Sequence, residues 1–165
     1  MKLDLSKVFD AEGEVVVVAA DVDLRWVKYR GLSPFNELIA CEAKACNRAG
    51  IVTLSCSYRY TLSLSCDRCL TPYTDEISKT FEHTVVRSLN SSDEDDEYVV
   101  APDGIVELNA LATNDIIPEL PSKFLCKEDC KGLCPVCGCN LNTNECDCKT
   151  EEPDSPFAAL DKFFD

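Results

Sequence analysis

The chain has 165 residues, the length of one ordinary domain with room for a small appendage. Hydrophobic residues make up 45% of the sequence, which is enough for a core and excludes a wholly disordered chain. Sixteen lysines and arginines against thirty aspartates and glutamates give a formal net charge of −14, which excludes a uniformly basic surface for nucleic acid.

The negative charge is concentrated in two short stretches. Residues 91–107 hold seven acidic side chains and no basic one, and residues 145–165 have a net charge of −5. Residues 1–90 have a net charge of only −1, so the body of the protein is nearly neutral. We predict that the acidic run, near residues 91–104, is a solvated loop, because like charges repel and resist compaction. The alternatives are a surface that binds a basic partner and a negative charge that limits nonspecific RNA contact.

The longest apolar run, Val15–Ala20, is far shorter than the roughly 20 residues of a membrane helix. Met1–Glu14 has no apolar core of the kind that a secretory signal peptide needs. We therefore expect a cytoplasmic protein that does not contact membranes. In such a reducing compartment, clustered cysteines bind metals more often than they form disulfides.

Several segments read as strands in chain order. Short strands are predicted over Glu14–Ala20 and Leu24–Tyr29, and a turn over Gly31–Pro34. The clearest pattern runs from Val52 to Cys66, where apolar, aromatic or cysteine side chains alternate strictly with polar ones. This period of two predicts a long half-buried strand, or two colinear strands with a bend. Ile77–Leu89 is a second extended stretch.

The remaining elements are shorter. Residues 66–72 contain two cysteines and are predicted to connect the two long strands as an antiparallel pair. Ile105–Leu108 reads as a short edge strand, and Asn109–Ile117 as a helix with Asn109 as its N-cap and Pro118 just after its end. The last segment contains four apolar residues at helical spacing: Phe157, Leu160, Phe163 and Phe164.

Together these elements predict an α+β fold that is mainly antiparallel β-sheet with one or two short helices and a zinc-knuckle-like C-terminal segment. We expect a β-rich domain over residues 1–121, a cysteine-rich zinc-binding segment over 122–150, and a linker with a short helix over 151–165.

The cysteines carry the strongest chemical signal. Residues 126–148 contain seven of the twelve cysteines and few large apolar residues, so this stretch cannot form a hydrophobic core and needs a cross-link. Four pairs have one to three residues between their members: Cys66 and Cys69, Cys126 and Cys130, Cys134 and Cys137, and Cys146 and Cys148. Zinc prefers four thiolate or imidazole ligands in a tetrahedron, and short loops of this kind place two sulfurs on one ion.

We favour two zinc sites with four thiolates each. One site would consist of Cys66, Cys69, Cys126 and Cys130, and the other of Cys134, Cys137, Cys146 and Cys148. A single zinc site with an unresolved set of ligands is the alternative.

Other interpretations of the cysteines fit less well. A disulfide framework would use longer spacings, and a redox pair would be expected at the start of a helix in a βαβ unit, which neither Cys-x2-Cys pair has. Cys41, Cys46 and Cys56 have no ligand spacing, and Cys56 falls on the apolar face of its predicted strand. His83 lies within a strand pattern and is predicted to be an ordinary histidine.

Five segments resemble the YceD-type large ribosomal RNA subunit accumulation protein family. These segments are Cys66–Leu70, Leu120–Pro121, Leu125–Gly138, Asn140–Asn142 and Cys146–Cys148. The resemblance implies a bacterial cytoplasmic protein, or a relative in an organelle stroma, that supports the accumulation or processing of large-subunit ribosomal RNA. It implies a link to large-subunit ribosomal proteins and no enzyme activity. It also implies that Cys139 is not a ligand, because the family often has a non-ligand residue there.

The leading hypothesis is a non-catalytic ribosome-biogenesis factor that contacts ribosomal RNA or a pre-ribosomal particle. The candidates for phosphate contact are Arg59, Arg68, Lys79 and Arg87. The alternative is a zinc-stabilised adaptor that binds a basic ribosomal protein through the acidic loop without touching RNA. Catalysis is not expected, because there is no glycine-rich phosphate loop and four-thiolate zinc has no open position for water.

Overall fold

The computed structural model describes residues 1–89 and 98–148. The chain forms two compact units, which we call the sheet unit and the cysteine unit. The sheet unit consists of Met1–Leu64 and Pro72–Phe124, and the cysteine unit of Ser65–Thr71 and the chain from Leu125 onward. The chain therefore enters the cysteine unit twice.

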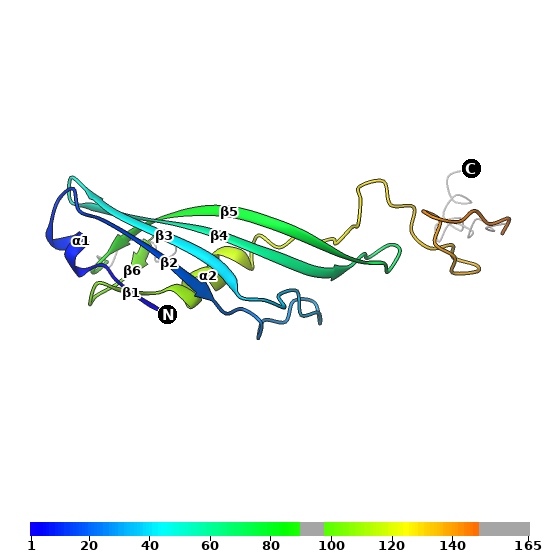
Figure 1. The fold of residues 1–165 in the computed structure, drawn as a ribbon, viewed down its shortest axis with the longest axis horizontal. Coiled ribbons are helices and arrows are strands. Elements are labelled where there is room, and N and C mark those ends of the chain that lie inside the picture. Colours follow the sequence, from blue (N-terminus) through cyan, green and yellow to red (C-terminus); the bar gives the residue numbers. More distant parts are fainter. Residues whose placement is uncertain (90–97, 149–165) are drawn as a thin grey trace, which may run out of the picture. The chain divides into compact units, whose positions relative to one another are not determined.

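A five-stranded sheet is the main element of the sheet unit (Figure 1). Its strands, in spatial order, are β2 (Val15–Val22), β3 (Ile39–Arg48), β4 (Ile51–Ser65), β5 (Pro72–Val86) and β6 (Tyr98–Val100). The β2–β3 and β3–β4 pairs are antiparallel, whereas β6 runs parallel to β5. Only six residues join β4 to β5, and so short a connection requires an antiparallel pair. The predicted α+β fold, mainly antiparallel, is confirmed.

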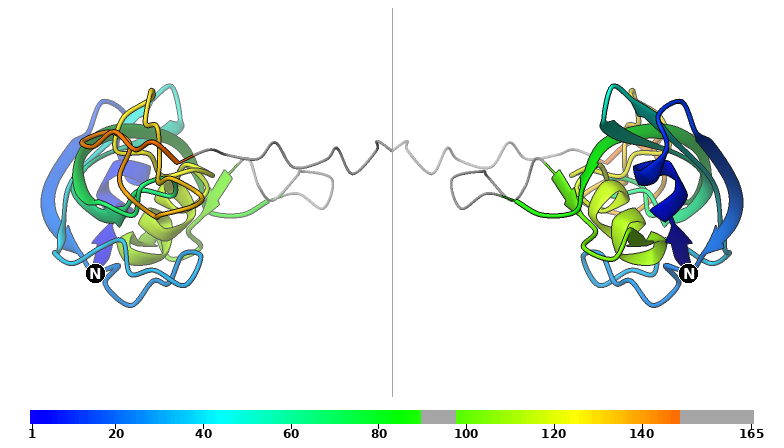
Figure 2. Two further views of the ribbon diagram at one scale, coloured as in Figure 1. Left: turned by 90° about the vertical axis from the view of Figure 1, so that its right-hand side faces the viewer. Right: turned by 90° about the vertical axis from the view of Figure 1, so that its left-hand side faces the viewer.

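The core lies on one face of this sheet. Along β4, every second side chain from Val52 to Leu64 is buried, which confirms the alternating pattern of the sequence. Figure 2 shows the curved sheet wrapping around α1 (Ser6–Asp10) and α2 (Leu108–Ile116). A separate two-stranded antiparallel sheet pairs β1 (Lys2–Asp4) with β7 (Ile105–Glu107).

β3 is a strand that the sequence analysis did not anticipate. Its inward residues are Ile39, Cys41, Ala43, Ala45 and Asn47. Alanine and cysteine are small, and alanine is not favoured in strands. The alternation of β3 therefore gives only a weak strand pattern in the sequence. The two-residue connection to β4, Ala49 and Gly50, has positive φ at both positions (51° and 82°), as a tight hairpin turn of the I′ type requires.

The strand predicted over Leu24–Tyr29 is wrong. Asp23 precedes it, and the Asp23 carboxylate accepts hydrogen bonds from the backbone N–H of Arg25 (3.0 Å) and from its guanidinium (2.9 and 2.8 Å). The Val27 N–H donates to the Leu24 carbonyl (3.0 Å), which closes a turn. This local aspartate bonding offers the backbone an alternative to a sheet.

The predicted helix near residue 109 is confirmed with a shifted start. α2 begins at Leu108, and its N-cap residue is Glu107 rather than Asn109. The reason is that β7 runs directly into the helix, and the Leu108 N–H donates to the Met1 carbonyl (2.8 Å). The predicted edge strand near Ile105 exists as β7, but it pairs with β1 and not with the main sheet.

Three other predicted segments differ from the structure in their bounds or lie outside the described residues. β5 extends from Pro72 to Val86, five residues earlier at its start than the predicted stretch. Residues 98–100, within the predicted acidic loop, form β6. The acidic residues 93–97 and the predicted C-terminal helix lie outside the described residues.

A buried polar network attaches α2 to the sheet. The Tyr58 hydroxyl donates to Asp115 Oδ2 (2.9 Å), and His83 Nε2 lies 3.1 Å from the same oxygen. Burial raises the pKa of Tyr58 well above its usual value. The hydrogen bond to Asp115 outweighs desolvation and raises the pKa of His83 above 6.5. His83 is therefore a partner of a buried carboxylate.

We predict that the single histidine of the chain titrates above pH 6.5 in the folded protein. Because the native pKa is raised, the stabilisation from this pair, about 1 kcal/mol, is complete below pH 6.5 and is lost as the pH rises through the native pKa. NMR titration of the imidazole measures this directly.

The variant Asp115→Asn removes the carboxylate and should lower the pKa of His83. The matched control Tyr58→Phe keeps the carboxylate, so the pKa of His83 should stay raised. An unchanged His83 pKa in Asp115→Asn would contradict the assignment.

Candidate metal centres

The first cysteine pair lies in the turn that follows β4. The Cys66 N–H donates to the Thr71 carbonyl (3.0 Å), and the Leu70 N–H donates to the Cys66 carbonyl (2.9 Å). Leu70 has a positive φ of 57°. The turn thereby brings the Arg68 N–H to 3.4 Å from Cys66 Sγ. Although burial opposes ionisation, backbone N–H groups of Cys126, Cys69 and Arg68 lower the pKa of Cys66 to about 6.

Four thiols gather around this turn, and we call them the first cluster. Its members are Cys66, Cys69, Cys126 and Cys130, whose sulfurs all lie within 4.8 Å of one another. The Cys66–Cys130 and Cys69–Cys126 sulfur pairs are 3.7 and 3.6 Å apart. A disulfide would need about 2.05 Å, whereas two thiolates on one tetrahedral zinc are about 3.8 Å apart. The geometry fits a metal ion, and these four are the residues that the spacing had grouped.

Hydrogen bonds surround the first cluster, and two of them, both made by Arg68, join the two segments of the cysteine unit. The Arg68 guanidinium donates to the Cys130 carbonyl (2.9 Å), and the Leu133 N–H donates to the Arg68 carbonyl (3.2 Å). The Asn142 amide donates to Cys130 Sγ (3.3 Å). Gly132 has a φ of 78°, and a Cβ there would lie 3.2 Å from the Arg68 carbonyl, so a side chain is poorly tolerated.

A second cluster follows in the C-terminal segment. The sulfurs of Cys134, Cys137, Cys139 and Cys146 lie within 4.8 Å of one another. We call these four residues the second cluster. The turn is closed by hydrogen bonds from the Cys134 N–H to the Cys139 carbonyl (2.8 Å) and from the Gly138 N–H to the Cys134 carbonyl (2.9 Å).

The second cluster differs from the predicted ligand set at one position. The structure brings Cys139 into the group of four, and the sequence analysis had left this residue out because of the family resemblance. One signal was available: Cys137 and Cys139 have the same one-residue spacing as Cys146 and Cys148. The choice of Cys148 as a ligand stays a prediction.

The composition of the cysteine unit is compatible with metal binding. Among its described residues, the buried ones are four cysteines and one glycine: Cys66, Cys69, Cys130, Gly132 and Cys134. No aliphatic or aromatic side chain is buried in this part of the described chain, so apolar burial cannot hold it together. Two such clusters can bind metal ions, and the ions would then serve as the cross-links.

The four basic residues proposed for RNA contact are not brought together. Arg59 is exposed on β4. Arg68 binds the Cys130 carbonyl within the cysteine unit. Lys79 forms an ion pair with Glu119, and Arg87 forms one with Asp10 (2.9 Å). Three of the four thus have a partner within the chain, although Lys79 and Arg87 form their ion pairs at the surface.

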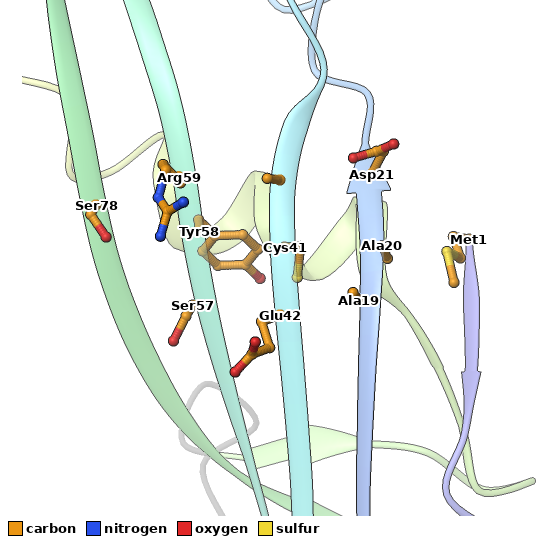
Figure 3. A pocket seen from close by; sticks show the side chains of 11 residues that line it. Met1, Ala19, Ala20, Asp21, Cys41, Glu42, Ser57, Tyr58, Arg59 and Ser78 are labelled. Carbon is orange, nitrogen blue, oxygen red and sulfur yellow. The ribbon is translucent and has the colours of Figure 1, made fainter.

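A hollow of about 650 Å³ lies on the face of the sheet opposite α2 (Figure 3). Its lining comes from β2 to β5 and from Met1, and consists mostly of small residues. Arg59 supplies the one guanidinium of the lining, while Asp21 and Glu42 supply carboxylates. The lining contains no histidine and no thiol–imidazole pair, so it shows no catalytic arrangement.

No helix in the described ranges 1–89 and 98–148 is long and apolar enough to span a membrane.

Comparison with known proteins gives one family. The model of the family described as large ribosomal RNA subunit accumulation protein YceD matches residues 54–164. This range contains most of β4, all of β5 and both cysteine clusters. No solved structure matches the chain significantly.

A curated relative agrees with the family match over a short region. The Arabidopsis thaliana protein named large ribosomal RNA subunit accumulation protein YCED homolog 1, chloroplastic, is 43% identical over 42 residues. The alignment covers 26% of the chain and 13% of the relative. The chain therefore matches only a small part of that protein.

We expect the purified protein to contain two zinc ions per chain, measured by native mass spectrometry. Cys126→Ser should remove one ion and Cys134→Ser should remove the other, and each variant should be cleaved faster by protease within residues 125–148, because metal binding supplies the folding free energy of this unit. Cys46→Ser, outside both clusters, is the control and should keep two ions. One ion in the wild-type protein would contradict the two-site assignment.

Proposed function

Because the chain belongs to the YceD family of large ribosomal RNA subunit accumulation proteins, we propose that it is a non-catalytic, zinc-stabilised factor that supports the accumulation or processing of large-subunit ribosomal RNA. The match over residues 54–164 is the observation that carries this proposal. It also confirms the resemblance found in the cysteine segments.

The role of the metal follows from the donor sets. The first cluster offers four thiols and no other ligand, which suits zinc at a closed structural site. When bound, zinc supplies a cross-link between Ser65–Thr71 and the chain from Leu125 onward. A four-thiolate ion has no open position for water, so it supports folding and not hydrolysis.

The absence of catalysis is part of the proposal. The family is named for an accumulation role and not for a chemical reaction. Within the described residues, the one histidine is engaged with the buried carboxylate of Asp115. Its partner across the network is the Tyr58 hydroxyl, which lies in the core with 1% exposure. Such a network stabilises the fold, and its Tyr58 and Asp115 members are buried.

The RNA or a pre-ribosomal particle is the proposed partner. Arg59 supports this part of the proposal, since it is exposed and points away from the core on the open face of the sheet, beside Ala40 of β3. Lys44 on β3 is exposed on the same face. Guanidinium and ammonium groups on an open sheet suit phosphate contact. The chloroplastic relative supports a location in an organelle stroma, and the bacterial cytoplasm is the alternative that the family resemblance implies.

A second candidate is an adaptor that binds a basic large-subunit ribosomal protein without touching RNA. It is favoured by one observation: Arg68, Lys79 and Arg87 each already bind a carbonyl or carboxylate group of the same chain, so of the four predicted phosphate contacts only Arg59 has no such partner among the described contacts. In this candidate the acidic residues 91–107 supply the binding charge.

The function itself is tested by complementation of bacteria that lack their own family member. Expression of the chain should raise the ratio of large- to small-subunit ribosomal RNA toward the wild-type value. The variant Cys126→Ser, which should lose the first zinc site, is expected to fail, whereas Cys46→Ser should restore the ratio. No change in the ratio with the wild-type chain, expressed at the normal level, would contradict the proposal.

Direct RNA contact is tested by ultraviolet crosslinking of the full chain in pre-ribosomal particles. We expect RNA crosslinks that weaken in Arg59→Gln, with the salt dependence of RNA binding reduced by about 0.7 to 0.9 in its logarithmic slope. Lys79→Gln is the matched control, because Lys79 is paired with Glu119 and should not change the slope. Crosslinks to ribosomal protein alone would favour the adaptor.

A further inference from the structure

The single tryptophan of the chain lies on the surface of the sheet unit. The Trp26 side chain is 66% exposed, more than any other large hydrophobic side chain among the described residues. Its segment is anchored by the buried side chains of Leu24 and Val27. The indole Nε1 donates a hydrogen bond to the Asp23 carbonyl (3.1 Å), which holds the ring against its own turn. An exposed ring that is already held in one orientation loses little freedom when it binds a partner.

The indole borders a second hollow, which has a volume of about 430 Å³. This volume lies within the range of about 300 to 1,000 Å³ that is usual for small-molecule sites. The rest of the lining comes from the start of α2 and the residue before it: Glu107, Asn109, Ala110, Thr113 and Asn114. The Thr113 hydroxyl donates to the Asn109 carbonyl (2.7 Å), so it is used within the helix. The amides of Asn109 and Asn114 are the neutral groups that a ligand in the hollow would meet.

The Asn109 amide has an unmet hydrogen bond. Its Oδ1 atom is buried and has no hydrogen-bond partner among the described residues. A half-turn of the amide exchanges the positions of Oδ1 and Nδ2. A ligand that donates a hydrogen bond to this amide would therefore remove the cost of a buried acceptor without a partner. Nucleobases carry donors and acceptors side by side on a planar edge, which matches the two asparagine amides.

The loop that carries Trp26 is basic, although the chain as a whole is acidic. Residues 23–33 contain three basic side chains and one acidic side chain, a net charge of +2: Arg25, Lys28, Arg30 and Asp23. Lys28 Nζ donates to the neutral Ser33 hydroxyl and so keeps its charge. The one carboxylate of the hollow, Glu107, binds the N-terminal amine (2.7 Å). A positive loop beside an aromatic ring attracts phosphate and repels a basic protein, which favours RNA as the occupant.

We propose that Trp26 and the start of α2 form a binding site for one unstacked base of single-stranded RNA. The base stacks on the indole, the amides of Asn109 and Asn114 bind its edge, and Lys28 contacts a flanking phosphate. This inference rests on the proposed function, because it names the place where the chain would contact ribosomal RNA. A base within a duplex is stacked between its neighbours and does not reach the indole, so the site selects loops, bulges and ends.

Fluorescence tests the site directly, because Trp26 is the only tryptophan. Titration of the full chain with a single-stranded RNA of about 12 nucleotides should quench the indole emission, whereas the same RNA annealed to its complement should leave the emission nearly unchanged. RNA that binds, measured by the anisotropy of a label on the RNA, without changing the emission would overturn the site and leave the proposed function standing. A chain that binds no RNA would overturn the proposed RNA contact as well.

Variants provide the second readout, with circular dichroism as the check of folding. Trp26→Ala should weaken binding of the labelled RNA about tenfold, and Trp26→Phe, which keeps an aromatic face, should recover most of this loss. Asn114→Ala should weaken binding about threefold, the effect of one hydrogen bond.

The matched control is Ile51→Ala, which also removes an exposed apolar side chain (58% exposed) and should not change the affinity. Ile51 lies at the β3–β4 hairpin, whereas the Trp26 loop follows the opposite end of β2 and β3. Equal RNA affinity of Trp26→Ala and the wild type would overturn the inference. If Trp26→Ala keeps its RNA crosslinks in pre-ribosomal particles and loses those to a ribosomal protein, the hollow is a protein-binding site and the inference is wrong.

Discussion

The described part of the cysteine unit has almost no apolar core to hold its shape, and sulfur–metal coordination is the interaction that we propose takes its place. Its buried described residues are cysteines and one glycine, so almost no apolar surface is removed from water when it folds. Hydrogen bonds from Arg68 and Asn142 to Cys130 would then orient this ligand of the first cluster. The sheet unit is the opposite case, in which alternate side chains of β3 and β4 form a conventional core with α2. Apolar burial thus stabilises the sheet unit, and metal coordination is the proposed source of stability for the cysteine unit.

The parts of the fold with large side chains could be predicted from the sequence. The strict alternation from Val52 to Leu64 predicted the position of β4 and its buried face. The spacing of Leu111, Ala112 and Ile116 predicted α2. β3 was not predicted, because its inward residues are mostly alanine and cysteine, which contribute little to a periodic pattern of hydrophobicity. The strand expected after Asp23 fails because one carboxylate bonds three N–H groups of Arg25, a local effect that outweighs apolar content.

The sequence also predicted only part of the candidate site. Short spacing identified all four members of the first cluster, because two sulfurs on one turn are close in space whatever the rest of the chain does. In the second cluster the spacing favoured Cys148 over Cys139, whereas the structure groups Cys139 with Cys134, Cys137 and Cys146. Nor does sequence show which cations are free. Arg68, Lys79 and Arg87 look like surface residues until the carbonyl and carboxylate groups that bind them are placed by the fold.

The first cluster is assembled from two segments, with Cys66 and Cys69 in a strand connection and Cys126 and Cys130 more than fifty residues later. During synthesis, strands β2 to β4 emerge from the ribosome well before Cys126 and Cys130. Until then, Cys66 and Cys69 provide only two of the four ligands. An ion bound by two thiolates is held weakly, and full coordination is reached only when the late segment has been translated. Completion of this centre therefore requires translation past Cys130, and a product terminated before that residue lacks it and exposes two unmatched thiols to oxidation.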